Sequence, residues 1–307
     1  MTLAILLSGQ GGQHPAMFDL TADRPEAAPV FEAAKPLLGG RDPRDLAKAG
    51  EELHGNRSGQ ILCCVSALAG WSIIAAAKPG RAIVAGYSIG DLAAWGVAGR
   101  FDPATVLRLA AARAEAMDAA SGEGFALAGI RGIGLQALTG LARSHDGHLA
   151  IRNAPDSFVV GGRRDALERL CCAATERGAQ RAVVLPVATP SHTPLLAVAS
   201  ARFRDLLAAV ELHRPPPSAP RLLSGLDGAP VFDARTGLDK LARQISETID
   251  WAACLEACGE YGADHVLELG PGHALATMAQ AALPAARVHA FDAFRTVDGV
   301  LDWIGRG

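Results

Sequence analysis

The sequence lacks an excess of positive charge. Its 29 Lys and Arg residues face 32 Asp and Glu residues, which leaves a net charge of -3. A general nucleic-acid-binding protein needs a basic surface to pair with phosphates, so we do not expect nucleic acid as a partner. An excess of glycine and proline is also missing: 34 Gly and 18 Pro among 307 residues, about 17% together, lie below the roughly 25–30% of low-complexity chains. Half of the residues are hydrophobic, so the chain can bury a large core.

The spacing of the cysteines does not suit a disulfide or metal framework. The six cysteines are Cys63, Cys64, Cys171, Cys172, Cys254 and Cys258. Two of the three pairs are adjacent in sequence, which suits neither a disulfide scaffold nor a tetrahedral zinc site. We expect small buried side chains in a reducing compartment, and no metal site.

Long hydrophobic runs are missing too. The first residues have no basic region before their apolar run, so we expect no signal peptide. The uncharged apolar segment Ile61–Ala77 has seventeen residues, at the lower limit for a membrane span, and it is rich in Ala, Ser and Cys. We predict a helix buried in the core of a soluble, cytoplasmic protein that has no membrane partner.

Short apolar runs that end at glycines alternate with helical patterns. Leu3–Leu7 and Ala82–Ala85 are typical of buried parallel strands. Asp91–Val97 and Pro103–Ala119 read as helices, the second with Asp102 as its cap and Pro103 at its first position. This alternation predicts an α/β fold with a parallel, doubly wound core.

The pattern changes after Gly122. It predicts alternating strands and helices, in the order Phe125–Ile130, Gly134–Arg143, Phe158–Val160, Arg164–Arg177 and Ala182–Leu185. Such a run favours a small inserted subdomain of ferredoxin-like type. We therefore expect an α/β hydrolase-like core over residues 1–122 and 188–307, and a ferredoxin-like small subdomain over 123–187. The later pattern predicts helices over Thr193–Val210 and Leu238–Ala257 and a strand over Val266–Leu269.

The sharpest motif is a strand, a G-x-S-x-G sequence and a helix pattern, with Ser88 between Gly86 and Gly90. This is the context of a nucleophile elbow, where small residues let strand and helix approach closely. The N-terminus of the following helix offers N–H groups to a developing oxyanion. An ordinary turn between a strand and a helix is the alternative.

A serine nucleophile needs a base, and the sequence contains nine histidines. His192 stands in a loop that opens a helix, in the sequence Pro190-Ser191-His192, and such loops carry catalytic groups in α/β folds. His273, which follows Gly270-Pro271-Gly272, is the main competitor. A structural loop histidine is the alternative for His192.

Two further candidates come from a glycine loop and a helix. Gly9-Gln10-Gly11-Gly12-Gln13 follows the first strand, yet it matches neither a dinucleotide fingerprint nor a Walker A loop. It is either a structural turn or a source of a backbone N–H for the oxyanion. Arg113 lies on an Ala-rich helix, where arginine usually sits at a solvated edge. If it faces Ser88, its planar fork would bind a substrate carboxylate.

Taken in order, these motifs resemble the malonyl-CoA:acyl carrier protein transacylases over nearly the whole chain. The matching segments are Gly9-Gln10-Gly11-x-Gln13, Gly86-x-Ser88-x-Gly90, Arg113, Asn153 in Arg152-Asn153-Ala154-Pro155, Ser191-His192, Gln244 in Ala242-Arg243-Gln244, and Glu268-Leu269-Gly270-Pro271-Gly272. Each is weak alone, but their order and spacing together are specific.

The resemblance implies a role for each matching residue. Ser88 would be the acylated nucleophile and His192 its general base, oriented by the main-chain carbonyl of Gln244 instead of a carboxylate. The backbone N–H groups of Gln10 and Ile89 would form the oxyanion hole. Of the substrate-binding residues, Arg113 would pair with the malonyl carboxylate and Asn153 would line the cleft from the small subdomain. Malonyl-CoA would be the substrate, with no bound cofactor and no metal.

Tyr87 departs from the family pattern, because most members have His before the serine. Gly86–Trp95 and Leu6–Pro15 look more like the epsilon subunit of malonate decarboxylase. We therefore expect that branch, which moves malonyl to a phosphoribosyl-dephospho-CoA thiol on a small acyl carrier subunit, with other decarboxylase subunits as further partners. The alternative is a transacylase of fatty-acid or polyketide synthesis, whose acceptor is a phosphopantetheine thiol. A serine esterase or thioesterase and a non-catalytic carrier-binding subunit are the alternatives from other classes.

Overall fold

The computed structural model describes residues 1–305 of the chain. Five parallel strands form its main sheet, in the order β10-β9-β1-β2-β7. Their bounds are β1 (Leu3–Leu7), β2 (Ala82–Gly86), β7 (Arg221–Leu222), β9 (His265–Leu269) and β10 (Arg287–Ala290). The three central strands are buried along their whole length, because helices or the second sheet cover both faces.

Alternate residues of β1 point into two different cores. Leu3, Ile5 and Leu7 belong to the larger hydrophobic cluster, while Ala4 and Leu6 belong to the cluster on the opposite face. The larger cluster takes its other members mainly from α1 (Ala28–Ala34), α2 (Pro43–Leu46), α3 (Asn56–Ile74), α4 (Ile89–Val97), α5 (Pro103–Ala120), α8 (Ala197–Ala208), α9 (Ala234–Arg243) and α12 (Val297–Gly305). The opposite face is covered by α10 (Trp251–Glu260) and α11 (Ala274–Ala282).

Helix α3 is the predicted core helix, displaced toward the N-terminus from the expected Ile61–Ala77. Within residues 1–305 it alone is long and apolar enough to cross a membrane, and 78% of its apolar window is buried inside the protein. It packs against α4 and α5. The cap predicted for α5 is present, since the Asp102 carboxylate accepts the backbone N–H of Thr105 at 2.7 Å.

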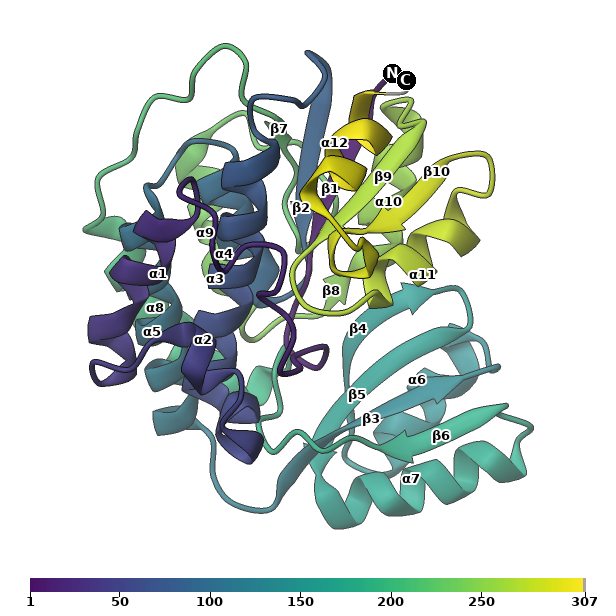
Figure 1. Cartoon of the computed structure of the whole chain (residues 1–307). Helices are drawn as coiled ribbons and strands as arrows, with labels where there is room; N and C mark the ends of the chain where they lie inside the picture. Colours follow the sequence, from purple (N-terminus) through teal and green to yellow (C-terminus); the bar gives the residue numbers. More distant parts are fainter. Residues whose placement is uncertain (306–307) are drawn as a thin grey trace.

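The middle of the chain forms a second, mostly antiparallel sheet with the order β6-β3-β5-β4-β8 (Figure 1). Its elements are β3 (Phe125–Arg131), α6 (Leu135–Ser144), β4 (His148–Ala154), β5 (Ser157–Arg163), α7 (Arg164–Glu176), β6 (Arg181–Val184) and, from later in the chain, β8 (Ile249–Asp250). Residues 125–184 thus follow a β-α-β-β-α-β order, which is that of ferredoxin-like units. The expected α/β fold class is confirmed.

Two element predictions were wrong. The strand β4 was missed. Register shifts along its pairing with β5 interrupt the alternation of apolar and polar residues from which a strand is predicted. The predicted helix Leu238–Ala257 is instead two helices, α9 and α10, separated by a turn and by β8. Its apolar pattern continues across the break, but Asp250 caps a new helix by accepting the N–H of Ala253 at 3.0 Å.

The expected subdomain limits at 122/123 and 187/188 fall in loops on either side of β3 and β6. We keep them as a proposed division of the chain. The short strand β8 pairs in parallel with β4 and thereby joins a segment of the core to the second sheet. The ion pair between Arg152 and Asp250, at 2.7 Å, strengthens the same junction.

Candidate active site

The candidate site forms where the carboxyl ends of β1 and β2 meet the second sheet. Parallel strands bring their following loops to one edge, as in other open α/β sheets. The loop after β1 contains Gln10, and the turn after β2 contains Ser88. A methyl group built on Gly9 would lie 3.6 Å from Cβ of Ser88, so the two loops are in contact.

Ser88 has the backbone conformation of a nucleophile elbow. Its φ of 55° and ψ of -116° are unfavourable for any residue other than glycine. The turn is closed by close backbone packing: a Cβ on Gly86 would lie 2.1 Å from the backbone of Gly90, and a Cβ on Gly90 would lie 2.1 Å from the carbonyl oxygen of Leu7. The two glycines of the motif therefore let β1, β2 and α4 converge behind the serine.

His192 contacts Ser88 on one side of its ring and Gln244 on the other. The distance from Ser88 Oγ to His192 Nε2 is 2.9 Å. His192 Nδ1 bonds to the main-chain oxygen of Gln244, which can only accept, so Nδ1 carries the ring hydrogen. Nε2 is then an acceptor for the serine hydroxyl, and this is the tautomer that a general base requires.

The histidine is also held in its neutral form. Burial lowers the pKa of His192 to about 3, and the nearby positive charge of Arg113 acts in the same direction, while the hydrogen bond to Gln244 opposes both. At neutral pH the ring can therefore accept a proton, and a charge that formed on it would be stabilised by the Gln244 carbonyl.

Arg113 is buried beside the serine, with 1% of its surface exposed. The alternative of a solvated helix edge is therefore wrong. Its Nη1 donates to Gln60 Oε1 at 2.7 Å, and its Nη2 lies 3.5 Å from Ser88 Oγ. No carboxylate within residues 1–305 forms an ion pair with it, and its Nε has no hydrogen-bond partner there. Burial lowers the pKa of Arg113 to about 10, so the guanidinium keeps its charge at neutral pH.

The backbone N–H groups expected for an oxyanion hole belong to the helix that follows Ser88 and to the loop that contacts it. In the first turn of α4, the N–H of Gly90 donates to Tyr87 and the N–H of Asp91 donates to Ser88. The N–H of Ile89 has no acceptor among the described residues, as expected at the first position of a helix. In the facing loop the N–H of Gly11 is bonded to Gln13 Oε1 at 2.5 Å, whereas the N–H of Gln10 has no acceptor in the same part of the chain.

Asn153 reaches the site from β4 of the second sheet. Its Oδ1 accepts a hydrogen bond from the Tyr87 hydroxyl at 3.1 Å. The Tyr87 ring packs edge-on against Trp251, with 5.3 Å between the ring centroids. Burial raises the pKa of Tyr87, so this hydroxyl remains a donor. The residue that departs from the family pattern thus links the nucleophile turn to the second sheet.

Two buried residues of the site were missed by the sequence analysis. Gln60 holds Arg113 and itself donates to Asn56 at 2.8 Å. Asp91, 1% exposed, accepts a hydrogen bond from Gln244 Nε2 at 2.9 Å. A signal for Asp91 was present, because it is the one charged residue between Gly86 and Val97. No comparable signal marks Gln60.

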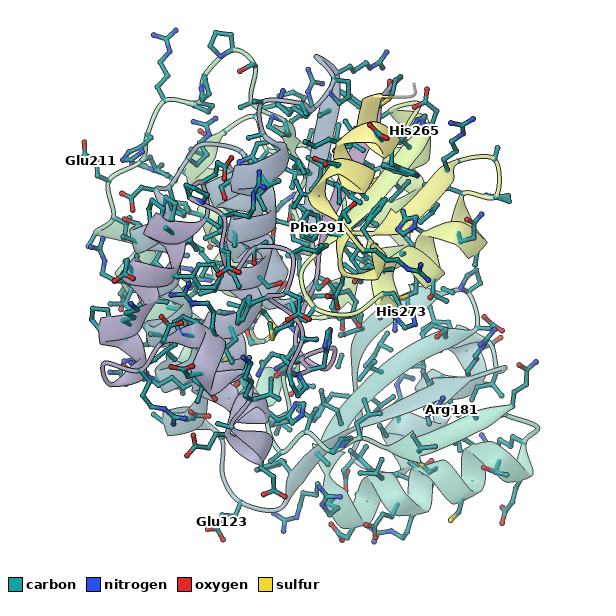
Figure 2. The ribbon with its side chains drawn as sticks, viewed as in Figure 1. Glu123, Arg181, Glu211, His265, His273 and Phe291 are labelled. Carbon is teal, nitrogen blue, oxygen red and sulfur yellow. The ribbon has the colours of Figure 1, made fainter. Side chains whose placement is uncertain are left out.

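The competing histidine lies elsewhere. His273 is exposed at the N-terminus of α11 (Figure 2), where it lines a cleft of about 740 Å³ with His14 and Asp292. The hydrogen-bond partner of Ser88 is instead His192.

Five of the six cysteines are buried as expected, while Cys172 is exposed on α7. Residues 1–305 contain no cluster of three or more His, Cys, Asp or Glu residues that could hold a metal ion.

The α/β fold and the serine–histidine geometry fit an enzyme that carries an acyl group on a serine, and the relatives place it among the acyltransferases. The malonyl CoA-acyl carrier protein transacylase of Salmonella typhimurium is 30% identical to it over 291 residues, covering 89% of this chain and 90% of the relative. The chain belongs to the malonyl-CoA:acyl carrier protein transacylase family.

Other relatives agree. The transacylase of Mycobacterium tuberculosis is 30% identical over 287 residues, covering 91% of this chain and 92% of the relative. The crystal structure of an acyl-carrier-protein S-malonyltransferase from Burkholderia pseudomallei superimposes with a TM-score of 0.90 at 29% identity, covering 98% and 100% of the two chains. A malonyl-transacylase solved in complex with a type II polyketide acyl-carrier protein also has a TM-score of 0.90, at 26% identity and 98% and 99% coverage. No protein-family model matches the chain.

The low pKa of His192 predicts a pH-dependent stability. The folded protein protonates this ring only near pH 3, whereas an unfolded histidine does so near pH 6.5. Between these values the unfolded chain binds more protons, so the free energy of unfolding falls as the pH falls through this window. When the pH falls from 7 to 5, we expect the free energy of unfolding, measured in urea, to decrease by about 1–2 kcal/mol more for wild type than for His192→Gln.

The matched control is His273→Gln, which replaces an exposed histidine and should retain the wild-type pH dependence. Equal slopes for wild type and His192→Gln would contradict a buried neutral histidine.

Proposed function

We propose that the protein transfers malonyl from malonyl-CoA, through an ester on Ser88, to the phosphopantetheine thiol of an acyl carrier protein. The family assignment supports this reaction, and the neighbour solved with its acyl-carrier protein supports such a carrier as the partner. The transfer needs no redox cofactor, because acyl exchange between a thioester and an ester changes no oxidation state.

The observation that carries the proposal is the buried charge of Arg113. A buried guanidinium without a carboxylate partner is costly, so it implies that a ligand brings one. The free carboxylate of a malonyl group fits this requirement, and a planar fork of N–H donors matches its geometry. A simple esterase acting on neutral acyl groups has no use for this cation next to Ser88.

In the first half-reaction His192 Nε2 takes the proton of Ser88 as Oγ attacks the thioester carbonyl. The oxyanion that forms accepts hydrogen bonds from the N–H groups of Gln10 and Ile89. The tetrahedral intermediate then expels the CoA sulfur, which takes the proton from His192. Ser88 is left as a malonyl ester and His192 is again neutral.

In the second half-reaction the carrier thiol takes the place of CoA. His192 removes the thiol proton, the sulfur attacks the ester carbonyl, and Ser88 recovers a proton from His192 as it leaves. Both halves use the same base and the same oxyanion donors, so the mechanism is a ping-pong exchange.

A second candidate function is the transfer step of malonate decarboxylase. Tyr87 favours it, because this residue and its neighbours resemble the epsilon subunit of that system, and other decarboxylase subunits would then be partners. The relatives reported above carry the name of the acyl carrier protein transacylases, which supports the fatty-acid or polyketide reaction instead. We therefore place the decarboxylase branch second, in a reversal of the order that the motifs alone suggested.

The covalent step predicts a labelled serine. Incubation with radiolabelled malonyl-CoA, followed by peptide mapping, should place the label on Ser88, and Ser88→Ala should carry none. Label released as free malonate, at a rate independent of any carrier, would identify a thioesterase. An unlabelled wild-type protein would contradict the mechanism.

The role of Arg113 predicts a change in acyl preference. Arg113→Ala should lower kcat/KM for malonyl-CoA roughly 10²-fold or more, since the substrate carboxylate loses its buried partner, and should leave transfer of acetyl little changed. Arg57→Ala is the matched control, because Arg57 is partly exposed and pairs with Glu115, whereas Arg113 is buried beside Ser88. Equal losses for malonyl and acetyl would rule out carboxylate recognition.

The two candidate functions predict different acceptors. An acyl carrier protein with a phosphopantetheine thiol should accept malonyl with a kcat/KM at least about tenfold higher than a carrier with the phosphoribosyl-dephospho-CoA group, a preference of about 1.4 kcal/mol. Purified carriers of both kinds, assayed by malonyl transfer from the same labelled enzyme, measure this ratio. The opposite preference would support the decarboxylase branch.

A further inference from the structure

Asp91 is a buried carboxylate that the proposed chemistry does not use. It lies three residues after Ser88, in the first turn of α4, and 1% of its surface is exposed. Burial raises its pKa to about 7. Within residues 1–305 no cation forms an ion pair with it; the Gln244 amide donates to it at 2.9 Å, and the backbone N–H of Gly225 is a second donor. Burial of a carboxylate costs free energy unless hydrogen bonds or charges compensate for the lost water. The presence of a buried carboxylate at this position therefore requires an explanation.

Gln244 carries the carbonyl that orients His192. It is fully buried at the C-terminal end of α9, and its own side chain turns toward α4. The next residue, Ile245, accepts the N–H of His192 at 2.9 Å. The position of the Gln244 peptide therefore sets both the backbone and the ring of His192.

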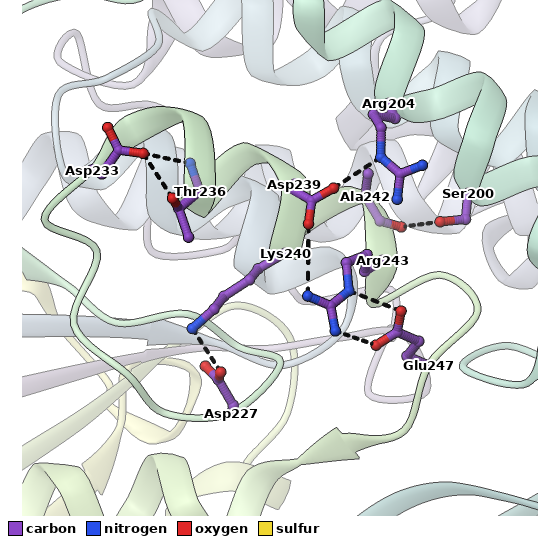
Figure 3. A network of polar contacts seen from close by, with 10 residues as sticks. All are labelled: Ser200, Arg204, Asp227, Asp233, Thr236, Asp239, Lys240, Ala242, Arg243 and Glu247. Atoms are coloured by element: carbon purple, nitrogen blue, oxygen red, sulfur yellow. Dashed lines mark hydrogen bonds and ion pairs between the residues drawn. The ribbon is translucent and has the colours of Figure 1, made fainter.

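Helix α9 is anchored mainly from its other sides (Figure 3). Ser200 donates to the carbonyl oxygen of Ala242, Arg204 pairs with Asp239, and Lys240 pairs with Asp227. These contacts fix the helix against α8 and a neighbouring loop, but none of them reaches the serine. The bond from Gln244 to Asp91 is the one that ties the end of α9 to the helix that begins at the nucleophile.

We propose that Asp91 is a positioning residue, which holds the Gln244 side chain so that the Gln244 carbonyl directs His192 Nε2 at Ser88. The inference rests on the proposed roles of Ser88 and His192. It explains how a base and a nucleophile 104 residues apart keep a 2.9 Å contact, because one bond links the helix behind the serine to the peptide behind the histidine.

A stabilising role alone would not require Gln244. An acidic residue in the first turn of a helix interacts favourably with the helix dipole, and this would affect stability without affecting the direction of His192. The two explanations therefore differ in whether the effects of Asp91 and Gln244 on reactivity depend on each other.

The test is a double-mutant cycle on serine reactivity, read with a fluorophosphonate that labels activated serines. Asp91→Ala removes the acceptor, and Gln244→Met removes the donor while it keeps the main-chain carbonyl and a similar side-chain size. Each change should slow labelling of Ser88 roughly 10- to 100-fold, since a small misalignment of a catalytic group has effects of this order. The double variant should label Ser88 at a rate within about twofold of the slower single variant, because both changes break the same bond.

Asp233→Ala is the matched control, because Asp233 caps the exposed N-terminal end of the same helix by accepting the N–H of Thr236 (Figure 3). It should lower the Tm and keep the labelling rate. Losses that multiply in the double variant, or an unchanged rate in Gln244→Met, would overturn the inference. If Asp91→Ala does not fold, Gln244→Met decides the question alone. A wild-type protein that reacts with the fluorophosphonate but not with malonyl-CoA would disprove the proposed function and leave the positioning test valid.

Discussion

The close convergence of β1, β2 and α4 behind Ser88 is the constraint on which the site depends. Two glycines bring these backbones within van der Waals contact, and the serine is thereby held in a conformation that L-residues rarely adopt. The same turn leaves the N–H of Ile89 without an acceptor among the described residues and points the serine side chain toward His192 and Arg113. Strain at one residue is thus maintained by packing that involves three elements of the core.

Electrostatic interactions at the site involve mainly the charge of Arg113 and the protonation state of His192. Within residues 1–305 Arg113 is a buried cation without an ion-pair partner, and burial together with the charge of Arg113 lowers the pKa of His192 and keeps it neutral. A neutral imidazole is what a base needs, and an unpaired guanidinium is what a dicarboxylic acyl group needs. One arginine therefore serves both requirements, and Gln60 keeps it in place without neutralising its charge.

The second sheet closes the site from the opposite side through a few specific contacts. Tyr87 bonds to Asn153, Arg152 pairs with Asp250, and β8 pairs with β4. Tyr87 occupies the position before the nucleophile. Its hydrogen bond to Asn153 joins the nucleophile turn to the second sheet near Ser88.

Local chemistry explains what the sequence by itself determined. Short apolar strands ending at glycine, the Asp102 cap and the G-x-S-x-G turn are properties of neighbouring residues, so the α/β class and the nucleophile could be predicted. The break between α9 and α10 and the irregular strand β4 depend on pairing with distant segments. The periodicity of hydrophobic residues along the sequence therefore does not predict them. Only the tertiary structure decided that His192, and not His273, faces the serine, that Arg113 is buried and that Asp91 meets Gln244. Each of these contacts joins residues far apart in the chain, and their distances and desolvation exist only once the core has packed.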